Sequence, residues 1–190
     1  MDMEHGDRQH LDELLENLWS LLGMLRGEMK AKWDRCLPLQ ELIGDRWERA
    51  RFLGFGEGTS IYESALVFGD VKVGRHTWIG PFTILDGSGG LEIGDYCSIS
   101  AGVQIYSHDS VDWAVSGGKA SIERAPTKIG SRCYLGPNVV VGKGVTIGEG
   151  CVIGAQSLVL SDIPSGMKAM GIPAKIIGEV AAPSRKGENR

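Results

Sequence analysis

A large aliphatic residue recurs every six positions along most of this 190-residue chain. The series starts at Ile61, slips by two residues before Ile93, breaks off after Ile105 and resumes at Ile129. Its members are Ile61, Val67, Val73, Ile79, Leu85, Ile93, Ile99, Ile105, Ile129, Leu135, Val141, Ile147, Ile153 and Val159. A short fixed period sustained over this length is typical of a solenoid, in which each repeat adds one strand to a stack.

Two other positions of the hexad are restricted as well. Gly often follows the aliphatic residue, and a small or β-branched residue stands four positions after it. We interpret the pattern as a prism whose core holds one aliphatic residue per side, with Gly relaxing the backbone where it turns. Cys97, Cys133 and Cys151 occupy the small position, so we predict that they are buried and structural. No close pair of cysteines has the spacing of a zinc site or a disulfide framework.

The hexads resemble those of the hexapeptide-repeat acyltransferases over residues 57–178. This resemblance implies a mainly β fold, a left-handed parallel β-helix with three hexads per coil, and hence between four and five coils. The handedness comes from the resemblance, because parallel crossovers are usually right-handed. We expect an N-terminal helical segment (1–56), the β-helix acyltransferase domain (57–180) with a loop insertion (106–128), and a flexible tail (181–190).

The N-terminal segment has a helical pattern. Leu11, Leu15, Leu18, Leu22, Leu25 and Met29 recur at steps of three and four residues. This spacing predicts helix within residues 8–51, with a second helix running from Pro38 to Arg51. The segment is expected to cover the open first coil, whose strand edges would otherwise be unpaired. A coiled coil is the alternative.

Charge and hydropathy exclude several classes of protein. The formal net charge is −4, so no basic stripe is available to make nucleic acid the main partner. The acidic N-terminus lacks the apolar core of a signal peptide, and no apolar stretch reaches the length of a membrane span. A cytoplasmic location is the expectation.

Residues 106–128 interrupt the repeat without a period of their own, and long insertions in compact domains are often functional. They contain His108. Acyl transfer from a thioester to a hydroxyl needs a base, and the pKa of histidine suits that role. The segment YSHD resembles the loop of the sugar O-acetyltransferases, which implies that His108 is the catalytic base.

The second ring nitrogen of His108 needs an acceptor, and a backbone carbonyl, Asp86 or Glu123 could provide it. Asp86, Glu123 and Trp113 are our candidates on the substrate side, with Trp113 either a platform for a sugar or a packing residue. His76 competes as base, but it falls at a turn and is expected to face solvent. Some β-helix proteins are zinc carbonic anhydrases with three histidine ligands. The prism offers only His76 and His108, so we expect no metal.

The resemblance also implies sites for coenzyme A. The segment VIGAQSLVLSDIP is similar to the stretch that contacts CoA, and by this similarity the candidate residues are Tyr134, Gly136, Gly154 and Ala155. The motif GIPAK matches the closing motif of the family, which makes Lys175 a candidate partner for a CoA phosphate. Leu160-Ser161 replaces the usual Thr-Lys, so Lys168 or Lys143 could supply the missing cation.

These residues predict an acetyl-CoA-dependent O-acetyltransferase that acts on a saccharide, such as a sugar of a surface polysaccharide or lipopolysaccharide. The resemblance implies a homotrimer with active sites between neighbouring subunits. One alternative is N-acetylation of a nucleotide-linked amino sugar, although the short N-terminus lacks the nucleotide-binding domain that some of those enzymes carry. Another is a β-helix scaffold without catalysis, which binding of CoA would argue against.

Overall fold

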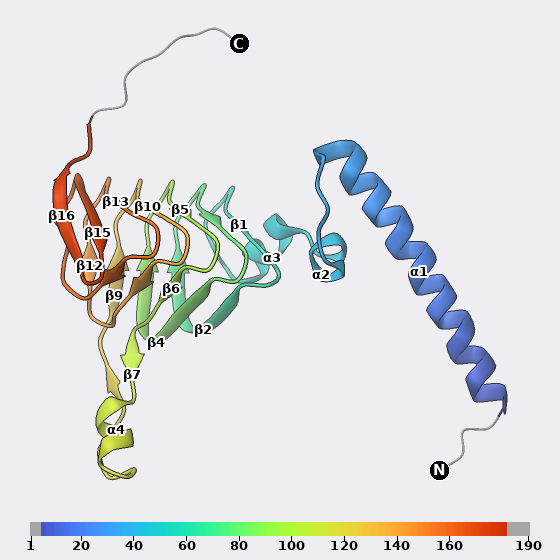
Figure 1. Cartoon of the computed structure of the whole chain (residues 1–190), viewed down its shortest axis with the longest axis horizontal. Helices are drawn as coiled ribbons and strands as arrows, with labels where there is room; N and C mark the ends of the chain where they lie inside the picture. Colours follow the sequence, from blue (N-terminus) through green and yellow to red (C-terminus); the bar gives the residue numbers. More distant parts are fainter. Residues whose placement is uncertain (1–4, 182–190) are drawn as a thin grey trace, which may run out of the picture. The chain divides into compact units, whose positions relative to one another are not determined.

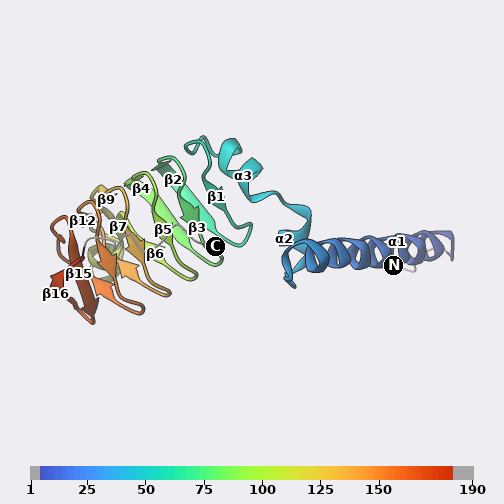
Figure 2. The same ribbon diagram turned by 90° about the horizontal axis from the view of Figure 1, so that it is seen from above.

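Short parallel strands stack on three faces of a prism and form a β-helix (Figures 1 and 2). A computed structural model of the chain describes residues 5–181. The first face consists of β1 (Ser60–Ile61), β3 (Trp78–Ile79), β5 (Ser98–Ile99), β10 (Tyr134–Leu135), β13 (Val152–Ile153) and β15 (Met167–Gly171). The predicted fold class is confirmed.

The second and third faces are joined by two long strands, β2 (Leu66–Val73) and β4 (Ile84–Ile93). β6 (Gln104–Ile105), β11 (Val140–Val141) and β14 (Leu158–Val159) continue the second face from the start of β4. β9 (Thr127–Ile129) and β12 (Thr146–Ile147) continue the third face from its end. The edge between these two faces is called the second edge below, and the edge between the first and second faces is called the first edge.

The core is the predicted one. All fourteen hexad aliphatics are buried except Val67, which is half-buried. Ile163 and Ala169 continue the inward series, and both are buried. The first face therefore has six parallel strands, so the predicted count of four to five coils is too low. The periodicity missed this last part because Ile163 follows Val159 by four residues and because Ala169 is small.

The glycines that follow the aliphatics have a different role from the one predicted. They do not adopt the left-handed conformation. A Cβ at Gly136 would instead lie 2.6 Å from the backbone nitrogen of Ala155 in the next coil. Non-glycine residues such as Tyr96 and Asn138 take the left-handed conformation at the corners, with φ of 56° and 58°. Gly is thus required for close stacking of coils, not for turning the chain.

The C-terminal end of the β-helix is closed by a hairpin, in which β15 pairs antiparallel with β16 (Ala174–Glu179). Residues 182–190, which make up nearly all of the predicted tail, lie outside the described residues.

The chain divides into two units, Met1–Asp45 and Arg46–Arg190. The first contains α1 (His5–Trp33) and α2 (Leu39–Ile43). The second begins with α3 (Arg46–Phe52), so the predicted single helix from Pro38 to Arg51 is wrong. Gly44 adopts an extended conformation between α2 and α3, and glycine disfavours a helix interior because its backbone has the most freedom to lose.

Within its own unit, α3 packs in the predicted way. It contacts β1, and Ala50 joins the buried core cluster. The guanidinium of Arg49 donates hydrogen bonds to the carbonyl oxygens of Tyr62 and Ala65. These contacts satisfy backbone acceptors of the first coil. Within residues 5–181, no helix has both the length and the apolar character that crossing a membrane requires.

Candidate active site

Both irregularities of the repeat lie at the second edge. Gly69 pairs with Gly87 and Val71 pairs with Leu91, so β4 has two more residues at this corner than β2 has. One coil further along, residues 106–128 leave the prism at the same edge, after β6. The two-residue slip and the long insertion are therefore neighbours in space.

The insertion is a short hairpin with a helical tip. β7 (His108–Asp109) pairs antiparallel with β8 (Glu123–Arg124), and α4 (Val111–Val115) lies between them in sequence. Figure 1 shows β7 leading away from the β-helix toward α4. Gly89 lets the hairpin approach the slip, since a Cβ there would lie 2.2 Å from the carbonyl oxygen of Ser107.

A carboxylate from the slip contacts the histidine of the hairpin. Nδ1 of His108 lies 2.5 Å from Oδ2 of Asp86. Because the carboxylate accepts this hydrogen bond, the proton resides on Nδ1 and Nε2 is left as the acceptor. The Asp86 side chain is 2% exposed, whereas that of His108 is 36% exposed. Of the three acceptors that the sequence left open, the structure selects Asp86.

Two serines that sequence reasoning missed hold the carboxylate. The backbone N–H of Ser88 donates to Oδ1 of Asp86 at 3.0 Å, and that of Ser107 donates to Oδ2 at 3.0 Å. The hydroxyl of Ser107 donates to the backbone oxygen of Asp86 at 2.6 Å and accepts from the N–H of Gly89 at 2.8 Å. The run Asp-Gly-Ser-Gly-Gly at the slip was the available signal, because such residues favour turns that use side-chain hydrogen bonds.

These contacts keep Asp86 charged. Burial by itself raises the pKa of its carboxyl, but hydrogen bonds from Ser88, Ser107 and His108 outweigh this effect and lower the pKa to about 2. A negative charge is therefore present beside the imidazole at neutral pH. It favours the tautomer with a free Nε2 and stabilises the imidazolium that forms when Nε2 takes a proton.

His108 opens onto a pocket of about 430 Å³ at the second edge. The pocket is lined by Tyr106, His108, Asp109, Ser110, Val111, Gly142, Lys143 and Leu160. It combines one histidine with apolar side chains and a pair of opposite charges. Trp113 does not line it; this residue lies on α4 with 49% of its surface exposed.

Glu123 turns to a lysine instead of to His108. Nζ of Lys143 lies 2.5 Å from Oδ2 of Asp109 and also contacts Oε2 of Glu123. Hydrogen bonds to Asp109 and then Glu123 raise the pKa of Lys143, and the hydrogen bond from Lys143 lowers that of Asp109. The positive charge of Lys143 is already met by two carboxylates, which argues against its use as a substitute cation for CoA.

The residues predicted to contact CoA gather elsewhere. Tyr134 is on the first face, and Gly136, Gly154 and Ala155 follow β10 and β13 at the first edge. Lys175 is exposed on β16. None of the five lines the pocket of His108. In a single copy of the chain, the candidate base therefore lies at the second edge. The residues predicted to contact CoA lie on the first face, at the first edge and on β16.

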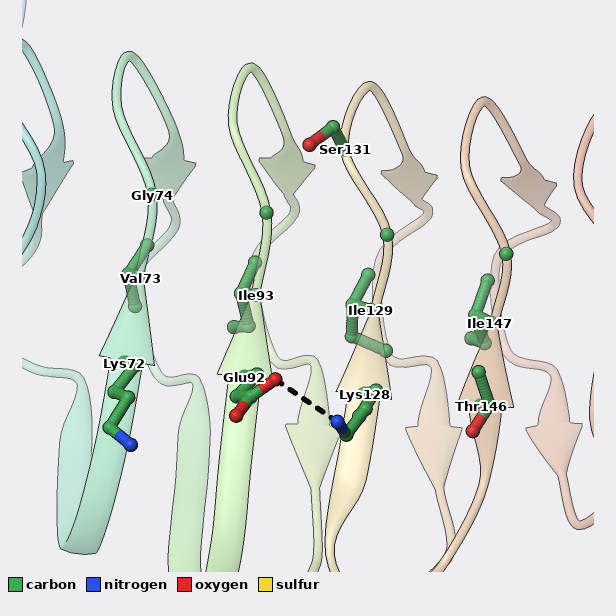
Figure 3. A pocket seen from close by; sticks show the side chains of 13 residues that line it. Lys72, Val73, Gly74, Glu92, Ile93, Lys128, Ile129, Ser131, Thr146 and Ile147 are labelled. Carbon is green, nitrogen blue, oxygen red and sulfur yellow. Dashed lines mark ion pairs between the residues drawn. The ribbon is translucent and has the colours of Figure 1, made fainter.

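A second hollow of about 550 Å³ runs along the third face (Figure 3). Lys72, Glu92, Lys128 and Thr146 line it beside the ends of four stacked strands, and Glu92 pairs with Lys128 at 3.3 Å. No predicted site residue lies there, and no histidine or cysteine lines it. We therefore place the candidate site at the smaller pocket.

The remaining candidates follow their predicted placement. His76 is exposed and stacks on Tyr96 with ring centroids 4.9 Å apart. Cys97, Cys133 and Cys151 are buried, as predicted. Each thiol lies near a backbone carbonyl of the next coil, for example Cys133 Sγ at 3.0 Å from the oxygen of Gly148. Among residues 5–181 there is no cluster of three or more His, Cys, Asp or Glu side chains that could hold a metal ion.

Comparison with known proteins supports the resemblance. Residues 126–161 match the family described as bacterial transferase hexapeptide (six repeats). No curated protein matches the sequence closely enough to count as a relative. The matched segment covers β9 to β14, the uninterrupted part of the β-helix.

Solved structures share the fold. AntD, an N-acyltransferase from Bacillus cereus solved with dTDP and coenzyme A, has 19% identity and a TM-score of 0.60, covering 70% of this chain and 89% of that one. A maltose O-acetyltransferase from Clostridium difficile 630 has 25% identity and a TM-score of 0.57, covering 85% and 89%. The acetyltransferase domain of PglB from Neisseria gonorrhoeae has 21% identity and a TM-score of 0.52, covering 65% and 50%. The chain therefore contains hexapeptide repeats over residues 126–161 and shares its fold with these solved acyltransferase structures.

Proposed function

We propose that this protein is an acetyl-CoA-dependent O-acetyltransferase that acts on a saccharide, with His108 as general base. The observation that carries the proposal is the pair formed by Asp86 and His108. A buried, charged carboxylate holds Nδ1, and Nε2 is left free at a pocket. This arrangement suits removal of a proton from a hydroxyl, because the base is neutral before the step and its cation is stabilised after it.

The chemistry needs few groups. The acceptor hydroxyl gives its proton to Nε2 of His108 while its oxygen attacks the thioester carbonyl. The carbon–sulfur bond then breaks, and the proton on Nε2 passes to the departing thiolate. The products are an ester and a free thiol, and His108 returns to its starting state. Asp86 remains charged throughout and stabilises the imidazolium between the two proton transfers.

The separation of the predicted donor residues from His108 supports an active site shared between copies of the chain, as in the proposed homotrimer. Tyr134 lies on the first face and Gly136, Gly154 and Ala155 lie at the first edge, whereas His108 lies at the second edge. A site composed of both sets requires the second edge of one copy to face the first edge of another. We therefore include in the proposal an active site between subunits, with Lys175 meeting a phosphate of the donor. A cytoplasmic location, where acyl-CoA is made, belongs to the same proposal.

N-acylation of a nucleotide-linked amino sugar is the second candidate. The likeness to AntD, which was solved with dTDP-4-amino-4,6-dideoxyglucose and coenzyme A, favours it. The Asp86–His108 pair favours the hydroxyl acceptor, since a hydroxyl must lose its proton as it attacks, whereas a neutral amine is already nucleophilic.

The test is turnover of acetyl-CoA against matched sugars and amino sugars, with and without a linked nucleotide. Wild type and His108→Ala should be compared on every acceptor. We expect activity on sugars with free hydroxyls, and its loss in the variant. Activity confined to amino sugars would support N-acylation instead. Binding of CoA without turnover on any acceptor would contradict both reactions.

A further inference from the structure

Two negative charges face each other across the hairpin that carries His108. Asp109 on β7 and Glu123 on β8 are directly opposite in the antiparallel register. Like charges in this position destabilise a strand pair. The hairpin has only two residues in each strand, so it has few hydrogen bonds to offset the repulsion. Left to itself, this pair would favour separation of β7 from β8.

A lysine from the prism lies between the two carboxylates. Nζ of Lys143 is 2.5 Å from Oδ2 of Asp109 and contacts Oε2 of Glu123. Its side chain is 23% exposed, less than those of Asp109 (37%) and Glu123 (53%). One cation therefore bridges a negative charge on each strand from a partly buried position.

Backbone hydrogen bonds on both sides of Lys143 hold it in place in the prism. The N–H of Gly142 donates to the carbonyl oxygen of Val159 at 2.9 Å. The N–H of Gly144 donates to Oγ1 of Thr127 at 3.0 Å, and the Thr127 hydroxyl donates to the carbonyl oxygen of Tyr106 at 2.7 Å. Lys143 thus belongs to the coil on which both ends of the insertion rest.

We infer that Lys143 is a positioning residue, which holds β7 against β8 by forming ion pairs with both Asp109 and Glu123 and so keeps His108 at Asp86. The inference rests on the proposed function only for its effect on turnover. His108 directly precedes Asp109 in β7, so separation of the strands would displace the imidazole from the carboxylate. On this view Lys143 has no contact with the acyl donor.

The experiment compares Lys143→Met, Glu123→Gln and the double variant Lys143→Met/Glu123→Gln in the full chain. Lys128→Met is the matched control, because Lys128 pairs with one carboxylate on the third face, away from the pocket. Hydrogen exchange of the backbone amides of residues 106–125 reports on the hairpin whether or not the protein is an enzyme. Steady-state kinetics with acetyl-CoA reports on the base.

Lys143→Met should speed hydrogen exchange in the hairpin and lower kcat by about ten-fold, in the range of coupling between charges in contact. KM for acetyl-CoA should change by less than about two-fold, because the residues proposed to bind the donor do not include Lys143. Glu123→Gln removes the charge opposite Asp109 and with it the repulsion between the strands. The double variant should therefore recover slow exchange and most of the lost kcat. Lys128→Met should match wild type in both measurements.

Unchanged exchange in Lys143→Met would overturn the inference, as would a double variant no better than Lys143→Met. A large rise in KM for acetyl-CoA without faster exchange would instead assign Lys143 to the donor. If wild type transfers no acyl group, the proposed function fails, yet the exchange data still decide whether Lys143 closes the hairpin.

Discussion

The uninterrupted coils from Thr127 to Val159 and the second edge around Asp86 are built from the same repeat, yet they differ in what they bury. In the regular coils the inward positions hold residues such as Leu135 and Ile153, both fully buried. At the second edge the buried side chain is the carboxylate of Asp86, and its oxygens accept hydrogen bonds from Ser88, Ser107 and His108. The regular coils are suited to stability, and the irregular edge is suited to chemistry.

The comparison shows how a repeat can hold a reactive group. Burying a charge is costly unless hydrogen bonds compensate for it. Two extra residues in β4 provide the compensation, because they place the N–H of Ser88 and the close approach of Gly89 beside the carboxylate. The corner lies between β2 on one side and β6 and β9, which flank the insertion, on the other.

Replacing the base should give the largest difference between the effect on turnover and the effect on stability. His108→Ala is expected to lower turnover by about two to four orders of magnitude, the usual contribution of general base catalysis. Thermal stability should change little, because the core of the prism is untouched. His76→Ala is the matched control and should keep wild-type rates. More than a tenth of wild-type turnover in His108→Ala would rule out His108 as the base.

Damage to a regular coil should give the opposite pattern. Leu135→Ala removes a fully buried side chain and should lower the free energy of unfolding by about 2–5 kcal/mol. Below the unfolding temperature, turnover per folded molecule should stay near wild type, since Leu135 lies on the first face and not at the pocket. Chemical denaturation and kinetics on the same sample measure both. A loss of turnover without a loss of stability would show that the two regions are not separable.

Asp86 is both buried and in contact with the candidate base, so its variant should affect both stability and turnover. Asp86→Asn should lower kcat by roughly ten- to a hundred-fold, because it removes the charge that stabilises the imidazolium. The folded-state pKa of about 2 lies below the ordinary aspartate value of 3.8, so wild type should lose about 2 kcal/mol of stability as pH falls from about 4 to 2. The variant should lack this loss. Identical acid unfolding of the two proteins would contradict the assignment.

The smallest effect is expected at the donor residues. Lys175→Ala should raise KM for acetyl-CoA about ten-fold, or about 1.4 kcal/mol, with kcat preserved, because it removes one contact to a phosphate. The effect should shrink at high salt. An unchanged KM at low ionic strength would remove Lys175 from the site and direct attention to Lys168 on β15.

The stacked β architecture could be predicted from the spacing of residues in the sequence. One inward aliphatic residue per hexad is enough to predict the stacked strands, the core and the burial of Cys97, Cys133 and Cys151, because burial of apolar side chains follows the period of the chain. The break at residues 106–128 likewise located His108. These features depend on local spacing, which the sequence displays directly.

The partner of His108 and the placement of the predicted donor residues could not be predicted from the sequence. Asp86, Glu123 and a backbone carbonyl were equal candidates as the partner of His108, because the sequence does not reveal which corner of which coil lies beneath the hairpin. Register places Asp86 there and turns Glu123 toward Lys143. It also separates the predicted donor residues from the base. Contacts between residues of different coils depend on how strands stack, and stacking is a property of the folded prism.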